Sequence, residues 1–329
     1  MRLAGDEVWT QPAASDAVGG QSDLTADEVW HLVLAVRHRR DQQRGDDGCW
    51  GFRRDGGGWV LAAEQLADLL VDPKRRSIHW LRVQPDAPGL ALVDLHLAHA
   101  LCDRGRGCVV AVLGQSLDGY IATCGGDSRY INGPESLVHL HRVRALSDAV
   151  LVGVGTALAD APRLTTRHVV GPSATRVVLD PKGRLPPTSG LLGDGLAPTI
   201  VVRATTERAA SRRLTEQATL LSLPAVDGMI PPADVVAALA ALGVGRVLVE
   251  GGGVTVGRFL DAGLINRLQL AVSPLILGSG RPALPVAPAD RLDQGLRPRC
   301  RAHAMGGDVL FDLSLTPWDA SAAANGEIC

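Results

Sequence analysis

The sequence lacks the patterns that mark several large classes of protein. It has no apolar run of about 18 residues, so we expect no helix that spans a membrane. Its first residues contain no basic stretch followed by an apolar core, which argues against a secretory signal. The formal net charge is only -2 over 329 residues, and a chain so balanced in charge is not expected to bind nucleic acid.

The cysteines also lack a metal-binding pattern. No two of the six form a C-x-x-C pair, and they are scattered as Cys49, Cys102, Cys108, Cys124, Cys300 and Cys329. We therefore expect free thiols, no metal and a cytoplasmic protein. The N-terminal part has no H-x-E followed by P-C-x-x-C, which excludes a zinc-dependent base deaminase there. With 46% hydrophobic and 21% charged residues, the chain can build an ample core.

Changes in composition and periodicity along the chain divide it into four parts. Residues 1–22 are small and polar without periodicity, and we interpret them as a flexible leader. Residues 23–104 contain four of the six tryptophans and predict a small, separate α/β or α+β domain of unknown role. Residues 105–316 form the main domain, and residues 317–329 a polar tail.

Within the tryptophan-rich part, Thr25 and Glu28 have the spacing of a capping box and open a predicted helix. A strand at 59–61 and a helix at 62–70 are expected to follow. The tryptophans could pack in a core or stack on a ligand, and their bulk favours packing.

From residue 107 onward, predicted strands alternate with predicted helices. Helices are expected at 134–146 and 233–242, and strands at 108–113, 149–153, 176–180, 199–202 and 246–250. Such alternation predicts a mainly parallel sheet with helices on both faces. The last two predicted strands, 267–277 and 308–315, have no helix between them, which indicates an antiparallel finish.

A strand, a glycine corner and a helix at residues 246–260 are the most prominent local pattern. Glycines allow a close approach to an anion, and the following helix directs its free N–H groups to the same point. Glu250, at the last strand position, would lie beside that point. The alternative is a simple tight turn, since the spacing is not the G-x-G-x-x-G of a Rossmann dinucleotide site.

Polar residues also follow two earlier strands. Asp118 with Gly119 predicts a turn, and the loop 125–130 ends in Ser128, Arg129 and Tyr130 before a helix. A third group spans 155–167 and includes Asp160. Each of these groups could face a ligand at the carboxyl edge of the sheet or form a solvated loop.

Arg144 raises a separate question. At 100° per residue in a helix, it projects between Leu137 and Leu140 within the apolar stripe, whereas Arg142 lies off it. An arginine directed at a core needs an anionic partner. This partner could be a carboxylate in a buried structural ion pair or the phosphate of a substrate, and the sequence leaves both alternatives open.

Taken in order, these motifs resemble the reductase domain of the RibD C-terminal family of riboflavin biosynthesis. The resemblance covers roughly residues 105–316, and the matching motifs are 115–119, 126–132, 156–160 with Pro162 and Arg167, 176–180, 249–252 and 274–278. It implies a dihydrofolate-reductase-like fold, NADPH as hydride donor and a ribosylaminopyrimidine 5′-phosphate as substrate. It also implies a homodimer.

The resemblance assigns roles residue by residue. Substrate contacts fall on Ser128, Arg144, Leu164, Arg167 and Glu250. NADPH contacts fall on Gly114, Tyr130, Thr156, Asp160, Gly252, Gly253, Val254, Thr255, Val256, Gly257 and Arg258. No proton donor is implied. Asp118 could supply a proton or serve only the turn.

Several departures from the family pattern leave the substrate open. Ala161 stands where the family often has aspartate, Tyr130 where it often has tryptophan, and Val112 and Leu113 where it often has a lysine. The deaminase half is replaced by the tryptophan-rich part. Two alternatives follow: reduction of another pyrimidine or a pterin, or a non-catalytic NADP-binding module that recruits a partner.

Overall fold

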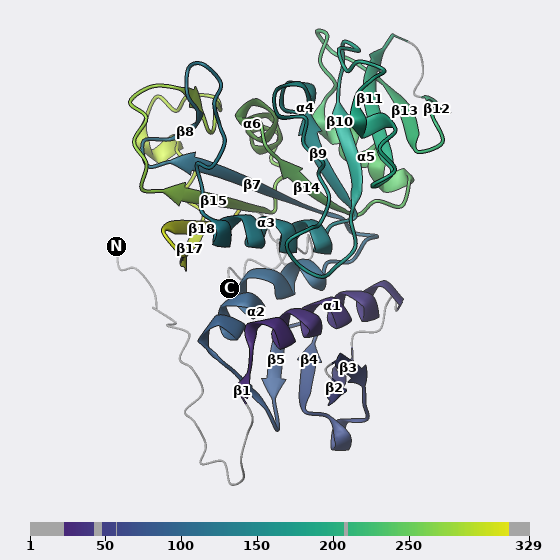
Figure 1. Cartoon of the computed structure of the whole chain (residues 1–329), viewed down its shortest axis with the longest axis vertical. Helices are drawn as coiled ribbons and strands as arrows, with labels where there is room; N and C mark the ends of the chain where they lie inside the picture. The colour runs from purple at the N-terminus through teal and green to yellow at the C-terminus, as the bar shows by residue number, and fades with distance from the viewer. Residues whose placement is uncertain (1–22, 43–47, 57, 207–209, 316–329) are drawn as a thin grey trace.

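The computed structural model describes residues 23–42, 48–56, 58–206 and 210–315 (Figure 1). The expected leader (1–22) and tail (317–329) lie outside these residues. Within the described ranges, no helix is both long enough and apolar enough to cross a bilayer.

The N-terminal part is an α+β unit. Helices α1 (Ala26–Gln42) and α2 (Ala87–Ala100) pack on each other beside a four-stranded antiparallel sheet of order β3-β2-β4-β5. Its strands are β2 (Trp50–Asp55), β3 (Gly58–Leu61), β4 (Leu69–Asp72) and β5 (Ser77–Trp80). A short parallel pair, β1 (Asp23–Leu24) and β6 (Gln84–Pro85), joins the starts of the two helices.

Two local expectations in this unit have opposite outcomes. The capping box is confirmed, because the Thr25 backbone N–H donates to Glu28 Oε2 at 2.9 Å. The helix expected at 62–70 is wrong, because only a 3₁₀ turn, η1 (Glu64–Leu66), forms before β4 begins. Leu69 and Val71 are fully buried on one side of β4. Buried residues here therefore recur at every second position, as in a strand, and not at the spacing of a helix.

The main domain is organised around one ten-stranded sheet of order β12-β13-β11-β10-β9-β14-β7-β15-β18-β17. Seven strands are mutually parallel: β7 (Cys108–Ser116), β9 (Ala149–Gly153), β10 (Thr175–Leu179), β11 (Thr199–Thr205), β13 (Ala218–Pro224), β14 (Arg246–Glu250) and β15 (Arg267–Ser273). Antiparallel strands close the edges: β12 (Ala210–Arg213), β17 (Arg299–Met305) and β18 (Asp308–Ser314). The mainly parallel sheet and its antiparallel finish are thus confirmed.

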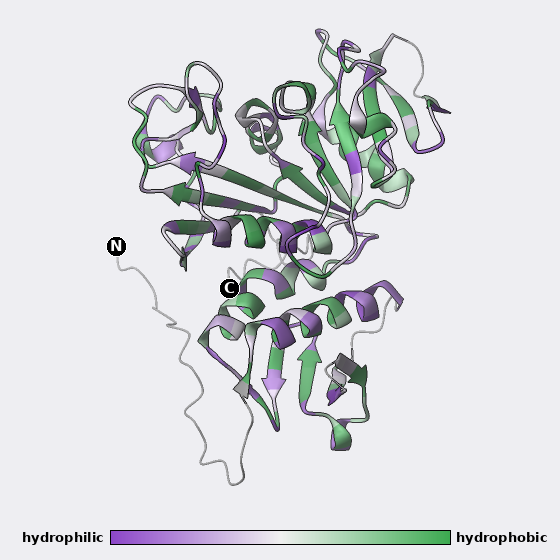
Figure 2. Ribbon diagram, viewed as in Figure 1, coloured by the Kyte–Doolittle hydropathy of each residue, from purple (hydrophilic) through white to green (hydrophobic). Residues whose placement is uncertain are grey.

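Helices cover both faces of this sheet. Along β7, Val109 and Ala111 pack toward α5 (Pro232–Ala241) and α6 (Gly253–Asp261), whereas Val110 packs toward α3 (Pro134–Leu146) and α4 (Val154–Asp160). The central strands are hydrophobic along most of their length in Figure 2, as expected for strands buried on both faces. Two short 3₁₀ turns, η2 (Gly190–Leu192) and η3 (Leu292–Gln294), and a small ribbon of β8 (Tyr120–Ala122) with β16 (Arg281–Pro282) complete the domain.

The N-terminal unit packs against the outer side of α3 (Figure 1). Ala145 and Leu146 of α3 belong to the same buried cluster as the core of that unit. Trp30 is 3% exposed and donates its indole N–H to the carbonyl of Val170 at 2.9 Å. The buried tryptophans of this unit therefore contribute to packing, and α3 lies between the sheet and a second layer.

Candidate active site

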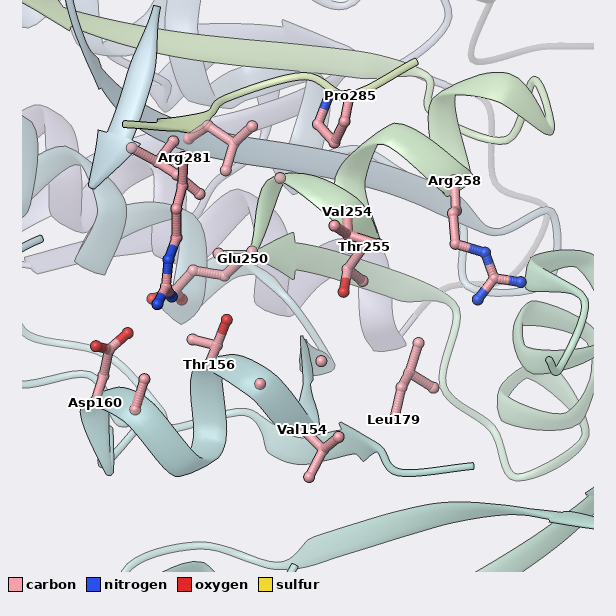
Figure 3. A pocket seen from close by; sticks show the side chains of 18 of the residues that line it. Val154, Thr156, Asp160, Leu179, Glu250, Val254, Thr255, Arg258, Arg281 and Pro285 are labelled. Atoms are coloured by element: carbon pink, nitrogen blue, oxygen red, sulfur yellow. The ribbon is translucent and has the colours of Figure 1, made fainter. Parts of the chain in front are cut away.

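A cavity of about 920 Å³ lies at the carboxyl ends of the central strands β7, β9, β10 and β14. This edge is where parallel α/β sheets bind ligands. Figure 3 shows Thr156 and Asp160 of α4 and Glu250 of β14 projecting into it, and Arg281 also lines it. Its charged lining consists of Asp160, Lys182, Arg184, Glu250, Arg258 and Arg281.

The glycine corner between β14 and α6 forms one wall of the cavity. Gly251 and Gly252 have φ angles of 73° and 72°, in the region that favours glycine. A Cβ on Gly253 would lie 2.4 Å from the carbonyl oxygen of Ala283, so a side chain has no room there. No side chain caps α6, and the Thr255 N–H donates to the Gly252 carbonyl at 2.9 Å, which leaves the N–H groups of Gly253 and Val254 for an anion.

The start of α4 lies directly beside this corner. A Cβ on Gly252 would be 2.9 Å from Thr156 Oγ1, and one on Gly153 would be 2.6 Å from Thr255 Oγ1. Thr156, Thr255 and Asp160 all line the cavity. Of the residues assigned to NADPH in this region, Val254 and Arg258 also line it, whereas Val256 and Gly257 are buried behind the wall.

Arg144 and Glu250 form a buried ion pair at the back of the cavity. Arg144 Nε donates to Glu250 Oε2 at 2.8 Å, and its terminal nitrogen donates to the other carboxylate oxygen. The remaining nitrogen donates to the Thr165 carbonyl at 2.9 Å. Glu250 lines the cavity and Arg144 lies behind it, so the arginine orients the carboxylate.

Arg167 and Leu164 belong to the segment that holds this pair. The Arg167 backbone N–H donates to His141 Nδ1 at 2.8 Å, and its guanidinium donates to the Thr165 hydroxyl at 3.0 Å. Burial lowers the pKa of Arg167, and the nearby charges of Arg144 and Arg163 lower it further. Leu164 is 1% exposed and has a φ of 57°. Neither residue lines the cavity.

A neutral histidine supports the same segment. Burial first, and then the positive charges of Arg144 and Arg167, lower the pKa of His141 to about 3. His141 can therefore accept the Arg167 N–H throughout the physiological pH range.

The residues assigned to β7 and to the loops that follow it separate into two groups. Gly114 and Ser128 line the cavity, and a Cβ on Gly114 would lie 1.8 Å from Asn132 Oδ1. Tyr130 is 95% exposed with a φ of 61° and does not line the cavity.

Asp118 lies outside the cavity lining and ties two loops together. Its carboxylate accepts the Ser116 hydroxyl at 2.6 Å and the backbone N–H groups of Leu277 and Gly278 at 3.1 and 2.6 Å. The Ser116 hydrogen bond is the main cause that lowers the pKa of Asp118, so the group is a carboxylate at neutral pH. These contacts fit a turn residue.

Three cationic residues that line the cavity were not predicted from the sequence. Lys182 and Arg184 follow β10, and Arg281 begins β16, at the end of the loop after β15. Lys182 and Arg184 come just after a strand of the parallel sheet, and this position could have predicted that they lie at the ligand-binding edge. Arg281 had no such signal, because its loop reaches the site only through tertiary folding.

The lining suits a dinucleotide better than a metal ion. The described residues contain no cluster of three His, Cys, Asp or Glu side chains that could hold a metal. The glycine corner, by contrast, lets the loop at Ala283 and the start of α4 approach closely, beside the uncapped start of α6.

Comparison with known proteins identifies the domain. Residues 108–303 match the family described as the RibD C-terminal domain. A 2,5-diamino-6-ribosylamino-4(3H)-pyrimidinone 5′-phosphate reductase of Methanothermobacter thermautotrophicus is 31% identical over 220 residues, which cover 64% of this chain and 99% of that protein. The riboflavin biosynthesis protein RibD of Aquifex aeolicus is 33% identical over 167 residues, 50% of this chain and 46% of that protein. The chain thus spans about half the length of such RibD proteins.

Solved structures show the same fold. RibD of Acinetobacter baumannii aligns with a TM-score of 0.58 at 19% identity, covering 89% of this chain and 99% of that one. The riboflavin biosynthesis reductase Rib7 of Saccharomyces cerevisiae aligns with a TM-score of 0.52 at 22% identity, covering 64% and 90%. The expected dihydrofolate-reductase-like fold is thereby confirmed. The chain belongs to the RibD C-terminal domain family.

Proposed function

We propose that the chain is an NADPH-dependent reductase of a phosphoribosylaminopyrimidine, which converts the ribosyl group to a ribityl chain in riboflavin biosynthesis or a related pathway. The observation that carries this proposal is that the glycine corner and Glu250 line the same cavity. The family and the archaeal relative named as a pyrimidinone phosphate reductase support the reaction class.

The residues of the chain would bind and orient the cofactor and the substrate, and would form no covalent bond to either. The N–H groups at the start of α6 would hold the cofactor phosphates beside Thr156 and Thr255. The Glu250 carboxylate, held by Arg144, would accept hydrogen bonds from the substrate. Bound NADPH would supply the hydride that reduces the open-chain imine or carbonyl carbon. Close positioning of the two ligands would then account for most of the rate.

The site roles assigned from the resemblance remain part of this proposal. Ser128 and Glu250 are in position to contact substrate because both line the cavity. Arg144 would act through Glu250, since its nitrogens already donate to Glu250 and Thr165. Homodimer formation is also proposed, and the molar mass of the purified chain in solution would test it.

The test is turnover with purified protein. NADPH oxidation would be followed with 2,5-diamino-6-ribosylamino-4(3H)-pyrimidinone 5′-phosphate and, separately, with 5-amino-6-(5-phosphoribosylamino)uracil. We expect one of the two to be reduced and the ribityl product to appear by mass spectrometry. Turnover of only a pterin or another carbonyl compound would identify a side-pathway reductase. NADPH binding without any turnover would instead favour the non-catalytic module.

A further inference from the structure

The segment between α4 and β10, residues 161–174, contacts both the candidate active site and the N-terminal unit, and we call it the bridging loop. On the side of the active site, the carbonyl of Thr165 accepts a hydrogen bond from the Arg144 guanidinium at 2.9 Å. The other two nitrogens of that guanidinium donate to Glu250. The bridging loop therefore holds Arg144 from one side while Glu250 holds it from the other.

On its other side, the bridging loop is bonded to the N-terminal unit. The buried indole N–H of Trp30 in α1 donates to the carbonyl of Val170 at 2.9 Å. A Cβ placed on Gly171 would lie 2.6 Å from Ala145 Cβ of α3 and 3.7 Å from Leu34 Cδ2 of α1. The backbone of the loop thus passes close to both helices at the point where Trp30 holds it.

The two halves of the bridging loop are also bonded to each other. The backbone N–H of Thr166 donates to the Ser173 hydroxyl at 3.1 Å, and the Thr166 hydroxyl donates to the Pro172 carbonyl at 2.9 Å. Thr166 directly follows the residue whose carbonyl holds Arg144. A contiguous set of hydrogen bonds therefore connects the indole of Trp30 to the Arg144 guanidinium.

Helix α1 makes a second contact, with the end of the helix that carries Arg144. The Arg37 guanidinium donates to the carbonyls of Leu146 and Ser147 at 3.2 and 3.4 Å. Carbonyls at a helix C-terminus lack partners within the helix, so this side chain satisfies groups that the helix itself leaves open. The N-terminal unit thus supports both α3 and the bridging loop next to Arg144.

The glycine corner lies on the other face of the sheet. Helix α6, which begins at this corner, packs with α5 on one face, whereas α3 packs on the opposite face. The N-terminal unit covers the outer side of α3 (Figure 1). The thickness of the sheet therefore separates the N-terminal unit from α6, and its support reaches the Glu250 side of the cavity.

We propose that the N-terminal unit positions the substrate side of the active site, with Trp30 as the positioning residue. Its indole N–H fixes the bridging loop, and the loop in turn holds Arg144 against Glu250. The proposal rests on the proposed function, since it takes Glu250 to contact the substrate. Small displacements of a group that orients a substrate cost a large part of the rate, so loosening the loop lowers turnover without removing any group from the cavity.

The experiment removes the indole N–H in the full chain. The variants are Trp30→Phe and a protein with benzothienylalanine at position 30, which keeps the shape of the indole and has sulfur in place of the N–H. Trp59→Phe is the matched control, because the Trp59 indole N–H also donates to a backbone carbonyl, that of Glu28, at 2.9 Å, but within the N-terminal unit. The measurements are steady-state kinetics with the pyrimidine phosphate that the wild type reduces, NADPH affinity by calorimetry, and hydrogen exchange of backbone amides.

We expect both changes at Trp30 to lower kcat/KM for the pyrimidine phosphate by about tenfold and to leave NADPH affinity within about twofold of the wild type. The amides of Thr166 and Arg167, which are bonded to Ser173 and His141, should exchange at least about tenfold faster. Trp59→Phe should match the wild type in all three measurements.

Unchanged exchange of the bridging loop in the benzothienylalanine protein would overturn the proposal and leave the reductase assignment standing. An equal loss of kcat/KM in Trp59→Phe, or an equal loss of NADPH affinity at Trp30, would also overturn it, because the effect would then be general destabilisation. A wild-type protein that reduces neither pyrimidine phosphate would overturn the proposed function, and the exchange rates would still decide whether Trp30 holds the loop.

Discussion

Arg144 and Glu250 lie 106 positions apart in the chain, yet the guanidinium of the first donates to both carboxylate oxygens of the second. The pair joins the last turn of α3 to the end of β14, and its side chains are only 6% and 14% exposed. A charge buried to this extent is stable only beside its partner. The orientation of the one carboxylate at the back of the cavity therefore depends on a helix on the outer face of the sheet.

The first prediction is that Arg144 and Glu250 are energetically coupled. Arg144→Met alone should lower the free energy of unfolding by about 3–5 kcal/mol, because it leaves a buried carboxylate unpaired. Adding Glu250→Gln should recover part of this loss, with a coupling energy of about 1–3 kcal/mol in a double-mutant cycle from urea unfolding. Purely additive effects would contradict the pairing. At permissive temperature, kcat/KM of Arg144→Met should fall about a hundredfold.

The second prediction concerns Gly253 in the glycine corner. Gly253→Ala would place a methyl group 2.4 Å from the Ala283 carbonyl oxygen, so the corner or the facing loop must shift. We expect dinucleotide affinity, measured by fluorescence titration, to fall at least about tenfold, because helix N–H groups must converge on the phosphates.

Gly190→Ala is the matched control, because nothing lies within 4 Å of a Cβ there and Gly190 does not line the cavity. Its dinucleotide affinity should equal that of the wild type. If Gly253→Ala binds the dinucleotide as tightly as the wild type does, the glycine corner is not the phosphate-binding site.

A third prediction arises from buried histidines between the N-terminal unit and α3. His96 of α2 is 1% exposed, and neither ring nitrogen has a hydrogen-bond partner among the described residues. Its ring lies 5.0 Å from that of His139 on α3, between centroids. Burial, reinforced by His139 and Arg142, lowers the pKa of His96 well below the usual value, and burial lowers that of His139 to about 4.

Because both folded-state pKa values are below the unfolded value of about 6.5, the unfolded chain binds more protons below that pH. The stabilisation is thus complete above about pH 6.5 and is lost as the pH falls toward the folded-state values. Each histidine should lower the free energy of unfolding by up to about 1.4 kcal/mol per pH unit between pH 6 and 5. Urea unfolding at several pH values measures this slope.

His96→Leu should reduce that slope without destabilising the protein at pH 7.5, since it removes a polar group buried without partners. The control His79→Ala, on an exposed position of β5, should keep the wild-type slope. An unchanged slope in His96→Leu would contradict the prediction.

The fourth prediction separates the two roles considered for Asp118. If the residue serves the turn, Asp118→Asn should retain kcat within about threefold, because the carboxylate does not line the cavity. It should lower the free energy of unfolding, because the amide satisfies the N–H groups of Leu277 and Gly278 less well. A loss of kcat of about a hundredfold or more, with normal thermal unfolding, would make Asp118 the proton donor instead.

Much of the fold could be predicted because its signals are local. Strands such as 149–153 and 246–250 are continuous apolar runs that end in glycine or a charge, and their alternation with helices indicates a parallel sheet. The edge strands β12 and β17, and β13 beside β12, were missed. The sequence Arg-Cys-Arg-Ala-His in β17 is polar and exposed, so no hydrophobic period marks it.

The sequence by itself determined the domain type, the glycine corner and the presence of Glu250 beside it, because each depends on residues adjacent in the chain. Only the tertiary structure decided that Arg144 donates to Glu250, that Lys182, Arg184 and Arg281 line the same cavity, and that the N-terminal unit packs against α3. The physical reason is that the partner of a buried charge, or the cover of an apolar helix face, is chosen by three-dimensional packing among distant segments. A periodic pattern shows that a partner is needed but does not say which residue supplies it.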